Sequence, residues 1–297
     1  MLTIDAIAAL AQEHKAKLDS RVREFSIGDR PFLFNTRPAI MGVVNLSPDS
    51  WYRESVCLSS EAAIDRARIL TAQGADLIDI GAESSLAQAS RVDEATQSAR
   101  LVPVIKELCK QGILVSVETY QAEVAAACLK AGAQVINMTG HEGSETFFRQ
   151  AAEHDAAVIL CYVEGKNVRE VGDFDFSRDP IEKMLEFFAR QIELAGRAGV
   201  EKIVIDPGLG FYYRNLQDSA QRVRFQMKTF LNSFRLRALG FPVCNALPHA
   251  FEYFREEVRC AEPFFAVLAA LGKTDLFRTH EVAKTKAVLD TLSQFAP

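Results

Sequence analysis

The stretch ILVSVETYQAEVAAACLKAGAQVINM, residues 113–138, contains the unit that decides the fold. Its first part, 113–118, is a nearly continuous apolar run, which is typical of a strand buried on both faces. Residues 121–132 have the spacing of an amphipathic helix that ends at a glycine. A second apolar run follows at 134–138. Strand, helix and strand in this order predict two parallel strands joined by a crossover helix.

The same alternation extends along the rest of the chain. Further strands are predicted at 39–45, 76–81, 156–163, 202–206, 242–247 and 275–279. Further helices are predicted at 59–75, 92–112, 180–199 and 216–240. Eight strands that alternate with helices favour a closed barrel over a doubly wound sheet. Since no low-complexity linker interrupts the pattern, we expect one α/β domain over residues 1–297, with the fold of a (β/α)8 (TIM) barrel.

Three local features refine this prediction. Residues 24–34 are typical of a β-hairpin around Gly28 and Asp29, which we expect to plug the N-terminal mouth of the barrel. Ser59 or Ser60 is expected to cap the helix at 59–75. Pro103 lies inside the predicted helix at 92–112, where a proline predicts a kink or a late start.

Composition and charge exclude several classes of function. The chain has 297 residues, of which 48% are apolar and 25% charged, as in a soluble globular protein with a sizeable core. The net charge of -5 argues against a nucleic-acid partner. No apolar stretch is long enough to span a membrane, and residues 1–18 lack the basic segment of a secretory signal. Six cysteines without a C-x-x-C pair predict core thiols in a reducing cytoplasm rather than disulfides or a metal site.

Polar residues end or follow most of the predicted strands. In a barrel, the carboxyl ends of the strands surround the ligand site. The polar residues at these ends are Asn45, Asp79, Glu118, Asn137, Asp206, Arg278 and His280. Each alone has an ordinary explanation, such as a turn, a helix cap or a satisfied buried carboxylate. Together they would leave charge desolvated without structural gain, so they predict a polar pocket on the barrel axis.

The residue types in this set indicate the chemistry of a ligand. Carboxylates and amides suit a heterocycle that displays N–H and amino groups, because carboxylates accept hydrogen bonds and amides both donate and accept them. Arg278 and His280 add donors near the start of the last helix, which suits a phosphate or diphosphate. The structural alternative is that Arg278 pairs with a barrel carboxylate while His280 caps that helix.

Five segments carry a resemblance to a known family. They are PAIMGVVNLSPDSW (38–51), GADLIDIGAESS (74–85), residues 113–137, KIVIDPGLGF (202–211) and LFRTHEVAKTKAVL (276–289). In this order they resemble the motifs of the dihydropteroate synthases, which are pterin-binding TIM barrels. The resemblance covers the chain from about residue 24 to residue 294, and five motifs in the same order are far more specific than one. We therefore interpret the chain as a diverged member of that family.

The resemblance implies a reaction and an assembly. In that family, a dihydropterin bearing a CH2-diphosphate loses diphosphate and is joined to p-aminobenzoate, an aromatic amine acceptor, in folate biosynthesis. The usual metal is Mg²⁺, which neutralises charge that grows on the diphosphate. A cytoplasmic homodimer acting on small molecules, with no nucleic-acid or membrane partner, is expected.

The resemblance also assigns roles to individual residues. Pterin binding is expected from Glu118, Asn137 and Asp206. Diphosphate binding is expected from Asn45, Arg278 and His280, with Asn45 also near the metal. The catalytic set is expected to be Asn45, Asp79, Arg278 and His280. The loop that orders the acceptor pocket is expected to contain Ser47, Pro48 and Asp49.

The chain departs from the family pattern at three places. Glu118 stands where the family has aspartate, which moves the carboxylate by about 1 Å. The loop at 84–88 lacks the arginine and the Pro-Gly turn of the family, and Arg91 lies only nearby. The segment 246–251 lacks the family's lysine and arginine, and has His249 instead.

These departures leave alternatives open. The chain is a synthase with an altered pocket, or it acts on another pterin or acceptor, including by methyl transfer, or it binds a pterin without catalysis.

Overall fold

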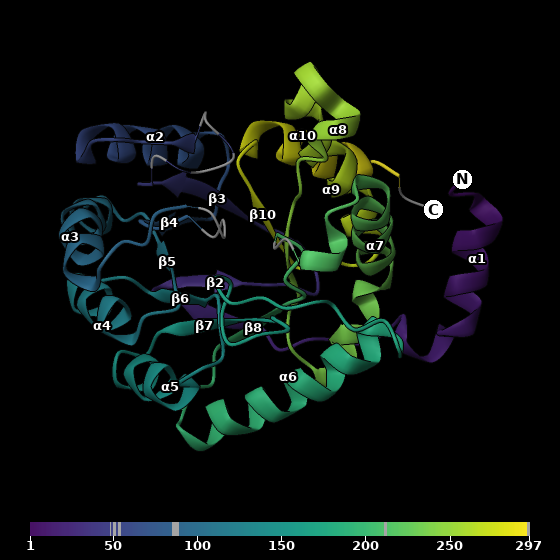
Figure 1. Ribbon diagram of the computed structural model, residues 1–297, viewed down its shortest axis with the longest axis horizontal. Coiled ribbons are helices and arrows are strands. Elements are labelled where there is room, and N and C mark those ends of the chain that lie inside the picture. Colours follow the sequence, from purple (N-terminus) through teal and green to yellow (C-terminus); the bar gives the residue numbers. More distant parts are fainter. Residues whose placement is uncertain (48, 50–51, 53–54, 85–88, 211–212, 296–297) are drawn as a thin grey trace.

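Eight parallel strands form one sheet in the computed structural model, which describes residues 1–47, 49, 52, 55–84, 89–210 and 213–295 (Figure 1). Their order is β8, β7, β6, β5, β4, β3, β10 and β9. The strands are β3 (Ala39–Asn45), β4 (Leu77–Gly81), β5 (Val115–Thr119), β6 (Val135–Met138), β7 (Ala157–Cys161), β8 (Ile203–Asp206), β9 (Cys244–Ala246) and β10 (Leu276–Thr279). A parallel bridge between Ile205 and Val243 joins β8 to β9, the two ends of this order. The predicted barrel is confirmed.

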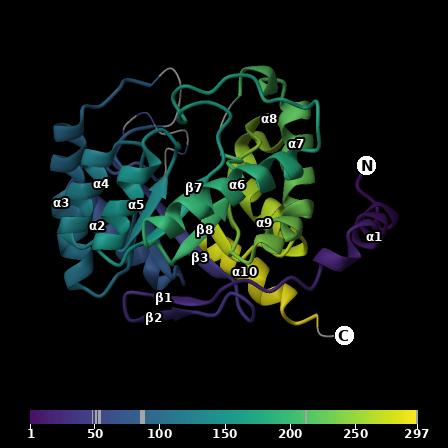
Figure 2. The ribbon, with the colours of Figure 1, turned by 90° about the horizontal axis from the view of Figure 1, so that it is seen from below.

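Helices surround the barrel on the outside (Figures 1 and 2). The α-helices are α1 (Ile4–Glu13), α2 (Ser60–Ala72), α3 (Glu94–Lys110), α4 (Ala122–Ala131), α5 (Ser144–Glu153), α6 (Pro180–Arg197), α7 (Ser219–Asn232), α8 (Phe251–Phe254), α9 (Ala261–Leu271) and α10 (Val282–Leu292). Short 3₁₀ helices are η1 (Lys15–Lys17), η3 (Arg214–Leu216), η4 (Ser233–Leu239) and η5 (Arg255–Cys260). Within the part of the chain just defined, no helix is both long and apolar enough to cross a membrane.

Local side chains fix where several helices begin and end. Ser59, rather than Ser60, caps α2, because its hydroxyl oxygen accepts a hydrogen bond from the backbone N–H of Ala62 at 3.1 Å. Asp93 caps α3 in the same way. Gly132 ends α4 with a φ of 112°, a left-handed conformation that other residues adopt only with strain.

Two helix predictions differ from the structure. Helix α3 begins at Glu94 and continues through Pro103, so the late start predicted from that proline is wrong. The side chains of α3 that face the barrel are fully buried, and their burial outweighs the cost of one proline. The predicted helix at 216–240 is divided, because Asp218 caps a new helix at Ser219 and the backbone tightens into η4 after Asn232.

The N-terminal hairpin lies across one end of the barrel (Figure 2). Strands β1 (Phe25–Ile27) and β2 (Arg30–Phe32) pair antiparallel on either side of Gly28. Ile27 and Phe32 pack in one buried cluster with Leu77 and Leu114, which lie at the start of β4 and just before β5. The hairpin therefore closes the N-terminal mouth, as predicted, and leaves the carboxyl ends of the strands for the ligand site. Helix α1, which the sequence did not predict, has no buried residue and stands at the side of the barrel (Figure 1).

All six cysteines are free thiols. Cys57, Cys128, Cys161 and Cys244 are buried, and Cys260 is exposed. The prediction of core thiols is confirmed for the four buried cysteines.

Candidate active site

Two adjoining cavities open at the carboxyl ends of the strands. The inner cavity is lined by Glu118, Asn137, Thr139, Cys161, Asp206, Gly208, Gly210, Ala246 and Arg278. The outer cavity shares Glu118, Gly210, Ala246 and Arg278 with it and adds Asn45, Tyr52, Glu83, Ser84, Leu209, Gln226, Leu247, Pro248, His249 and His280. A larger cavity of about 400 Å³ lies between α6 and α7, but none of the predicted site residues lines it. Six of the predicted site residues line the two cavities at the strand ends, namely Asn45, Glu118, Asn137, Asp206, Arg278 and His280.

Arg278 lies between the two cavities and pairs with two carboxylates. Its Nε atom donates to Oδ2 of Asp79 at 2.7 Å, and its Nη2 atom donates to Oε2 of Glu118. Burial lowers the pKa of Arg278, but the two carboxylates reverse this shift and raise it above its usual value. The structural alternative foreseen for Arg278, pairing with a barrel carboxylate, is thus realised, and Arg278 also faces the cavities.

Asp79 lies beneath the cavities and does not line them. Its side chain is fully buried on β4. Besides Arg278, it accepts hydrogen bonds from the Ser116 hydroxyl at 2.6 Å and from Nδ2 of Asn137 at 3.1 Å. Because three donors satisfy this carboxylate, its geometry is that of an anchor for Arg278 and Asn137.

Asp206 ends β8 at the wall of the inner cavity. Its Oδ1 atom accepts a hydrogen bond from the backbone N–H of Gly208 at 2.7 Å, in a turn that gives Gly208 a φ of 74°. Burial raises the pKa of Asp206 to about 6, although the Gly208 N–H and Arg278 oppose this shift. Burial also raises the pKa of Glu118, and Arg278 opposes it. The inner cavity is thus lined by two carboxyl groups that lack full solvation.

Asn45 ends β3 and lines the outer cavity. Its Nδ2 atom donates to the Ser55 hydroxyl at 2.6 Å, which fixes the side chain at the cavity wall. Of the predicted acceptor loop, the Ser47 hydroxyl accepts from the backbone N–H of Asp49 at 3.3 Å. Pro48 lies outside the described residues.

His280 follows β10 directly, and its ring turns toward α9. Its Nδ1 atom lies 2.7 Å from Oε1 of Glu262, and its backbone N–H donates to Oε2 of the same carboxylate. The residue that precedes α10 is Glu281, so the predicted alternative of His280 as a helix cap is wrong. The sequence did not single out Glu262. The sequence feature that could have identified it is a single carboxylate near the start of the apolar stretch that forms α9 (Ala261–Leu271), because a buried carboxylate needs partners.

An arginine that the sequence did not single out lies beside the second-strand loop. Arg169, from the segment after β7, has its Nε atom 3.4 Å from Oε1 of Glu83, and both side chains are buried. Its Nη1 atom donates to the carbonyl of Ser84 at 2.8 Å, and Nη2 donates to the carbonyl of Ala89. Arg91, in contrast, is exposed and pairs with Glu170. Arg169 therefore brings a buried cation to the loop that lacks the arginine of the family motif.

Comparison with known proteins shows the family. Residues 41–245 match the family described as pterin binding enzyme. The dihydropteroate synthase of Streptococcus pyogenes serotype M6 is 30% identical over 277 residues, which cover 89% of this chain and 97% of that protein. The chain belongs to the dihydropteroate synthase family. The family expected from the sequence is confirmed.

Two further similarities extend the comparison within the dihydropteroate synthase family. A structure of the dihydropteroate synthase from Xanthomonas albilineans in complex with 7,8-dihydropteroate has a TM-score of 0.74, at 27% identity, and covers 93% of this chain and 100% of that one. A probable bifunctional folylpolyglutamate synthase/dihydropteroate synthase of Halobacterium salinarum is 33% identical over 261 residues. Those residues cover 85% of this chain, which spans about a third (31%) of that longer relative.

Proposed function

We propose that this chain joins a dihydropterin bearing a CH2-diphosphate to p-aminobenzoate and releases diphosphate. The observation that carries this proposal is the division of the site into two parts. The inner cavity is lined by Glu118, Asn137 and Asp206, whereas the outer cavity adds Asn45 and His280. A flat heterocycle and an anionic leaving group need these two environments next to each other.

The inner cavity suits the pterin ring. Asp206 is ionised at neutral pH because its pKa is about 6, and a carboxylate accepts hydrogen bonds from ring N–H and amino groups. The Asn137 amide is held by Asp79 at 3.1 Å, which orients it for one specific partner. Hydrogen bonds from the ring would offset the desolvation of the two buried carboxyl groups, so the pocket binds a ring with N–H donors better than a purely apolar one.

The outer cavity suits the leaving group. In the reaction, the amine nitrogen of the acceptor forms a bond to the CH2 carbon, and the bond from that carbon to the diphosphate oxygen breaks. The diphosphate keeps the electron pair, and the amine nitrogen loses a proton to water. Arg278 lines both cavities, so its positive charge lies where the pterin ring ends and the leaving group begins. His280 adds a further donor at the outer cavity.

A magnesium ion fits this site through Asn45. The Nδ2 atom of Asn45 donates to Ser55, and an amide oxygen is a hard ligand of the kind that Mg²⁺ binds. Mg²⁺ binds through few protein oxygens when substrate phosphates and water complete its shell, so a single amide is sufficient. The ion would neutralise charge on the diphosphate when bound.

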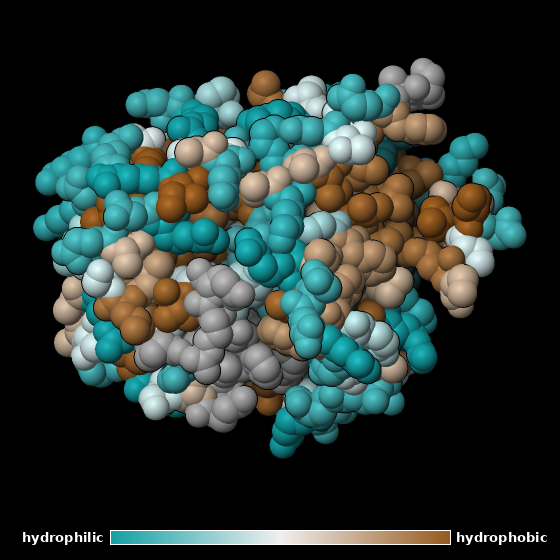
Figure 3. Space-filling view, turned by 90° about the horizontal axis from the view of Figure 1, so that it is seen from above, coloured by the Kyte–Doolittle hydropathy of each residue, from teal (hydrophilic) through white to brown (hydrophobic). Residues whose placement is uncertain are grey.

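We also propose that the chain acts as a cytoplasmic homodimer. Apolar side chains gather on the side of the molecule that carries α8, α9 and α1 (Figure 3). Tyr253 on α8 and Phe264 and Leu271 on α9 are exposed. Such a patch is typical of an interface. The six free thiols fit a reducing cytoplasm.

The test is an assay of diphosphate release with hydroxymethyl-dihydropterin diphosphate, Mg²⁺ and p-aminobenzoate, with dihydropteroate identified by mass. We expect product that scales with protein concentration and requires both substrates. Folded protein that binds the pterin without forming product would contradict the synthase proposal. That outcome would favour another acceptor or a purely binding role. The replacement of the family lysine by His249 is a reason to test both.

A further inference from the structure

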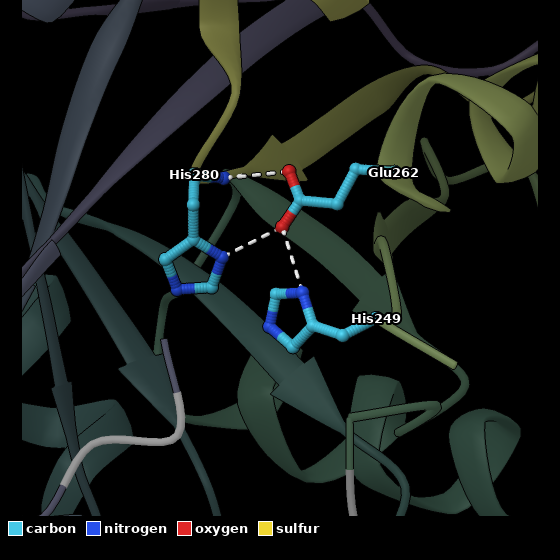
Figure 4. Close-up of side chains that lie close together, drawn as sticks. All are labelled: His249, Glu262 and His280. Carbon is cyan, nitrogen blue, oxygen red and sulfur yellow. Dashed lines mark hydrogen bonds and ion pairs between the residues drawn. The ribbon is translucent and has the colours of Figure 1, made fainter. Parts of the chain in front are cut away.

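Three side chains from successive elements near the end of the chain meet beside the outer cavity (Figure 4). His249 lies in the segment after β9, Glu262 lies on α9, and His280 follows β10. Nδ1 of His280 lies 2.7 Å from Oε1 of Glu262, and Nδ1 of His249 lies 3.5 Å from the same oxygen. One potential ligand atom from each residue lies within 4.8 Å of those of the other two. Two imidazoles therefore converge on one carboxylate oxygen.

The surroundings of Glu262 fix the direction of that oxygen. The other oxygen, Oε2, accepts hydrogen bonds from the Thr279 hydroxyl and from the backbone N–H groups of His280 and Glu281, at 2.9 and 3.0 Å for the two backbone donors. Oε1 is thus left to point between the two rings. Three hydrogen-bond donors and two imidazole rings therefore surround this buried carboxylate.

His249 presents a nitrogen without a hydrogen-bond partner. Within the part of the chain that the structure describes, its Nδ1 atom is buried and accepts or donates no hydrogen bond. A neutral imidazole at this position offers a lone pair from a ring nitrogen. The ring stacks on Tyr52, with 4.8 Å between the ring centroids, which holds it in place. An orphaned buried nitrogen costs stability unless something binds it.

We propose that His249, Glu262 and His280 form a binding site for a divalent transition metal ion such as Zn²⁺. Two imidazole nitrogens and one carboxylate oxygen make up a ligand set that holds zinc and leaves a fourth position open. Bond lengths near 2.0 Å place tetrahedral ligands about 3.3 Å apart, between the 2.7 and 3.5 Å found for the two histidine contacts with Glu262. On binding, the ion would take the place of the hydrogen between Nδ1 of His280 and Oε1 of Glu262, and the neutral ring would carry its hydrogen on Nε2.

The ligand types separate this site from the magnesium site proposed at Asn45. Imidazole nitrogens suit zinc, copper or nickel, whereas Mg²⁺ is held by oxygen ligands. The hydrogen bonds from Thr279 and the backbone to Glu262 act as the outer shell that orients a metal ligand.

The position of the site suggests what a bound ion would do. His249 and His280 both line the outer cavity, so a bound ion would lie at the wall of the place proposed for diphosphate. His249 stands where the family motif has a lysine, and a metal ion held there would restore the lost positive charge. This role rests on the proposed function, but metal binding itself does not.

The test is calorimetric titration of the full chain with Zn²⁺ after removal of metal with a chelator, without any substrate. We expect saturation at one ion per chain and at least a tenfold loss of affinity in His249→Phe, which keeps the ring stack on Tyr52 and removes the nitrogen. His154→Ala is the control, because His154 is an exposed histidine that directly follows α5 and is not one of the three proposed ligands. Thermal melts of each variant establish that it is folded.

A second readout identifies the ligands. Co²⁺ in a site of nitrogen and oxygen ligands absorbs only weakly in the visible range, whereas thiolate ligands add intense near-ultraviolet bands. We expect the weak visible bands, and we expect them to disappear in His249→Phe. Absence of stoichiometric binding, equal affinity in the histidine variant, or thiolate bands would each overturn the metal site. Because no substrate is present, these outcomes do not depend on whether the chain is a synthase.

Discussion

Nε of Arg278 on β10 donates to Oδ2 of Asp79 on β4, with 2.7 Å between the two atoms. The two strands are not neighbours, because β3 lies between them in the sheet. The pair therefore crosses the interior of the barrel and fixes the guanidinium at the border of the two cavities. Asp79 is fully buried, so the arginine also neutralises a carboxylate that has no access to solvent.

Arg278→Met should lower both stability and activity. The variant keeps the apolar stem but leaves Asp79 buried without a cation, which typically costs about 3 kcal/mol or more. It also removes positive charge from the proposed leaving-group site, so we expect kcat/KM to fall at least about a hundredfold. Urea unfolding and the diphosphate-release assay measure the two effects. Arg91→Met, at an exposed arginine, should change the free energy of unfolding by less than about 0.5 kcal/mol. Equal stability of both variants would mean that Ser116 and Asn137 satisfy Asp79 without the arginine.

Asp206→Asn should make the protein more stable and less able to bind a pterin. Burial raises the pKa of Asp206 from 3.8 to about 6, so the unfolded chain ionises first as the pH rises. The protonated carboxyl group stabilises the folded state below pH 4. The free energy of unfolding then falls by about 3 kcal/mol as the pH rises from 4 to 6. Asparagine keeps an acceptor for the Gly208 N–H and removes this loss. We expect the variant to gain stability relative to the parent at pH 7.5 but not at pH 4, by urea unfolding at both values.

Pterin affinity should follow the ionisation of the same carboxyl group. Below pH 6, the protonated Asp206 accepts hydrogen bonds less well, and the affinity should fall by about tenfold for each pH unit. Calorimetric titration with a pterin between pH 5 and 8 measures this profile. Asp206→Asn should bind weakly at every pH. A profile with the same slope in parent and variant would assign the titration to another group.

Glu118→Asp restores the family residue but should reduce activity. The shorter side chain withdraws its carboxylate by about 1 Å from Nη2 of Arg278, and a shift of this size typically costs up to a hundredfold in rate. We expect a lower kcat/KM with little change in stability. Steady-state kinetics measure the change, and Glu123→Asp on the exposed first turn of α4 is the control. A gain in kcat/KM would mean that the pocket has not adapted to glutamate.

Arg169→Met should loosen the second-strand loop. Removal of the guanidinium leaves the buried Glu83 carboxylate with neutral donors such as Tyr120 and Gln97, and removes one donor to the carbonyl of Ser84. We expect a loss of about 3 kcal/mol in unfolding free energy and a higher KM for the acceptor. Kinetics at varied p-aminobenzoate measure the second effect. Arg100→Met, at an exposed arginine of α3, should leave KM unchanged. A stability loss without a change in KM would limit Arg169 to a structural role.

The candidate site was only partly readable from the sequence. The residues at the strand ends were found because parallel strands place their carboxyl ends at one edge, which follows from the order of elements alone. Arg169 and Glu262 were missed because they lie in a connection and on a helix, where no periodic pattern marks them. The burial of Glu262 is visible only once α9 is packed against the end of β10.

The sequence by itself determined the barrel and the end at which polar groups gather, since apolar periodicity and turn residues are local properties of the chain. Only the tertiary structure decided which polar groups meet. It paired Arg278 with Asp79, 199 residues away, and directed Glu262 between two histidines. The physical reason is that such contacts depend on the directions of the side chains. Packing across the whole barrel sets these directions, and no single segment of the sequence specifies them.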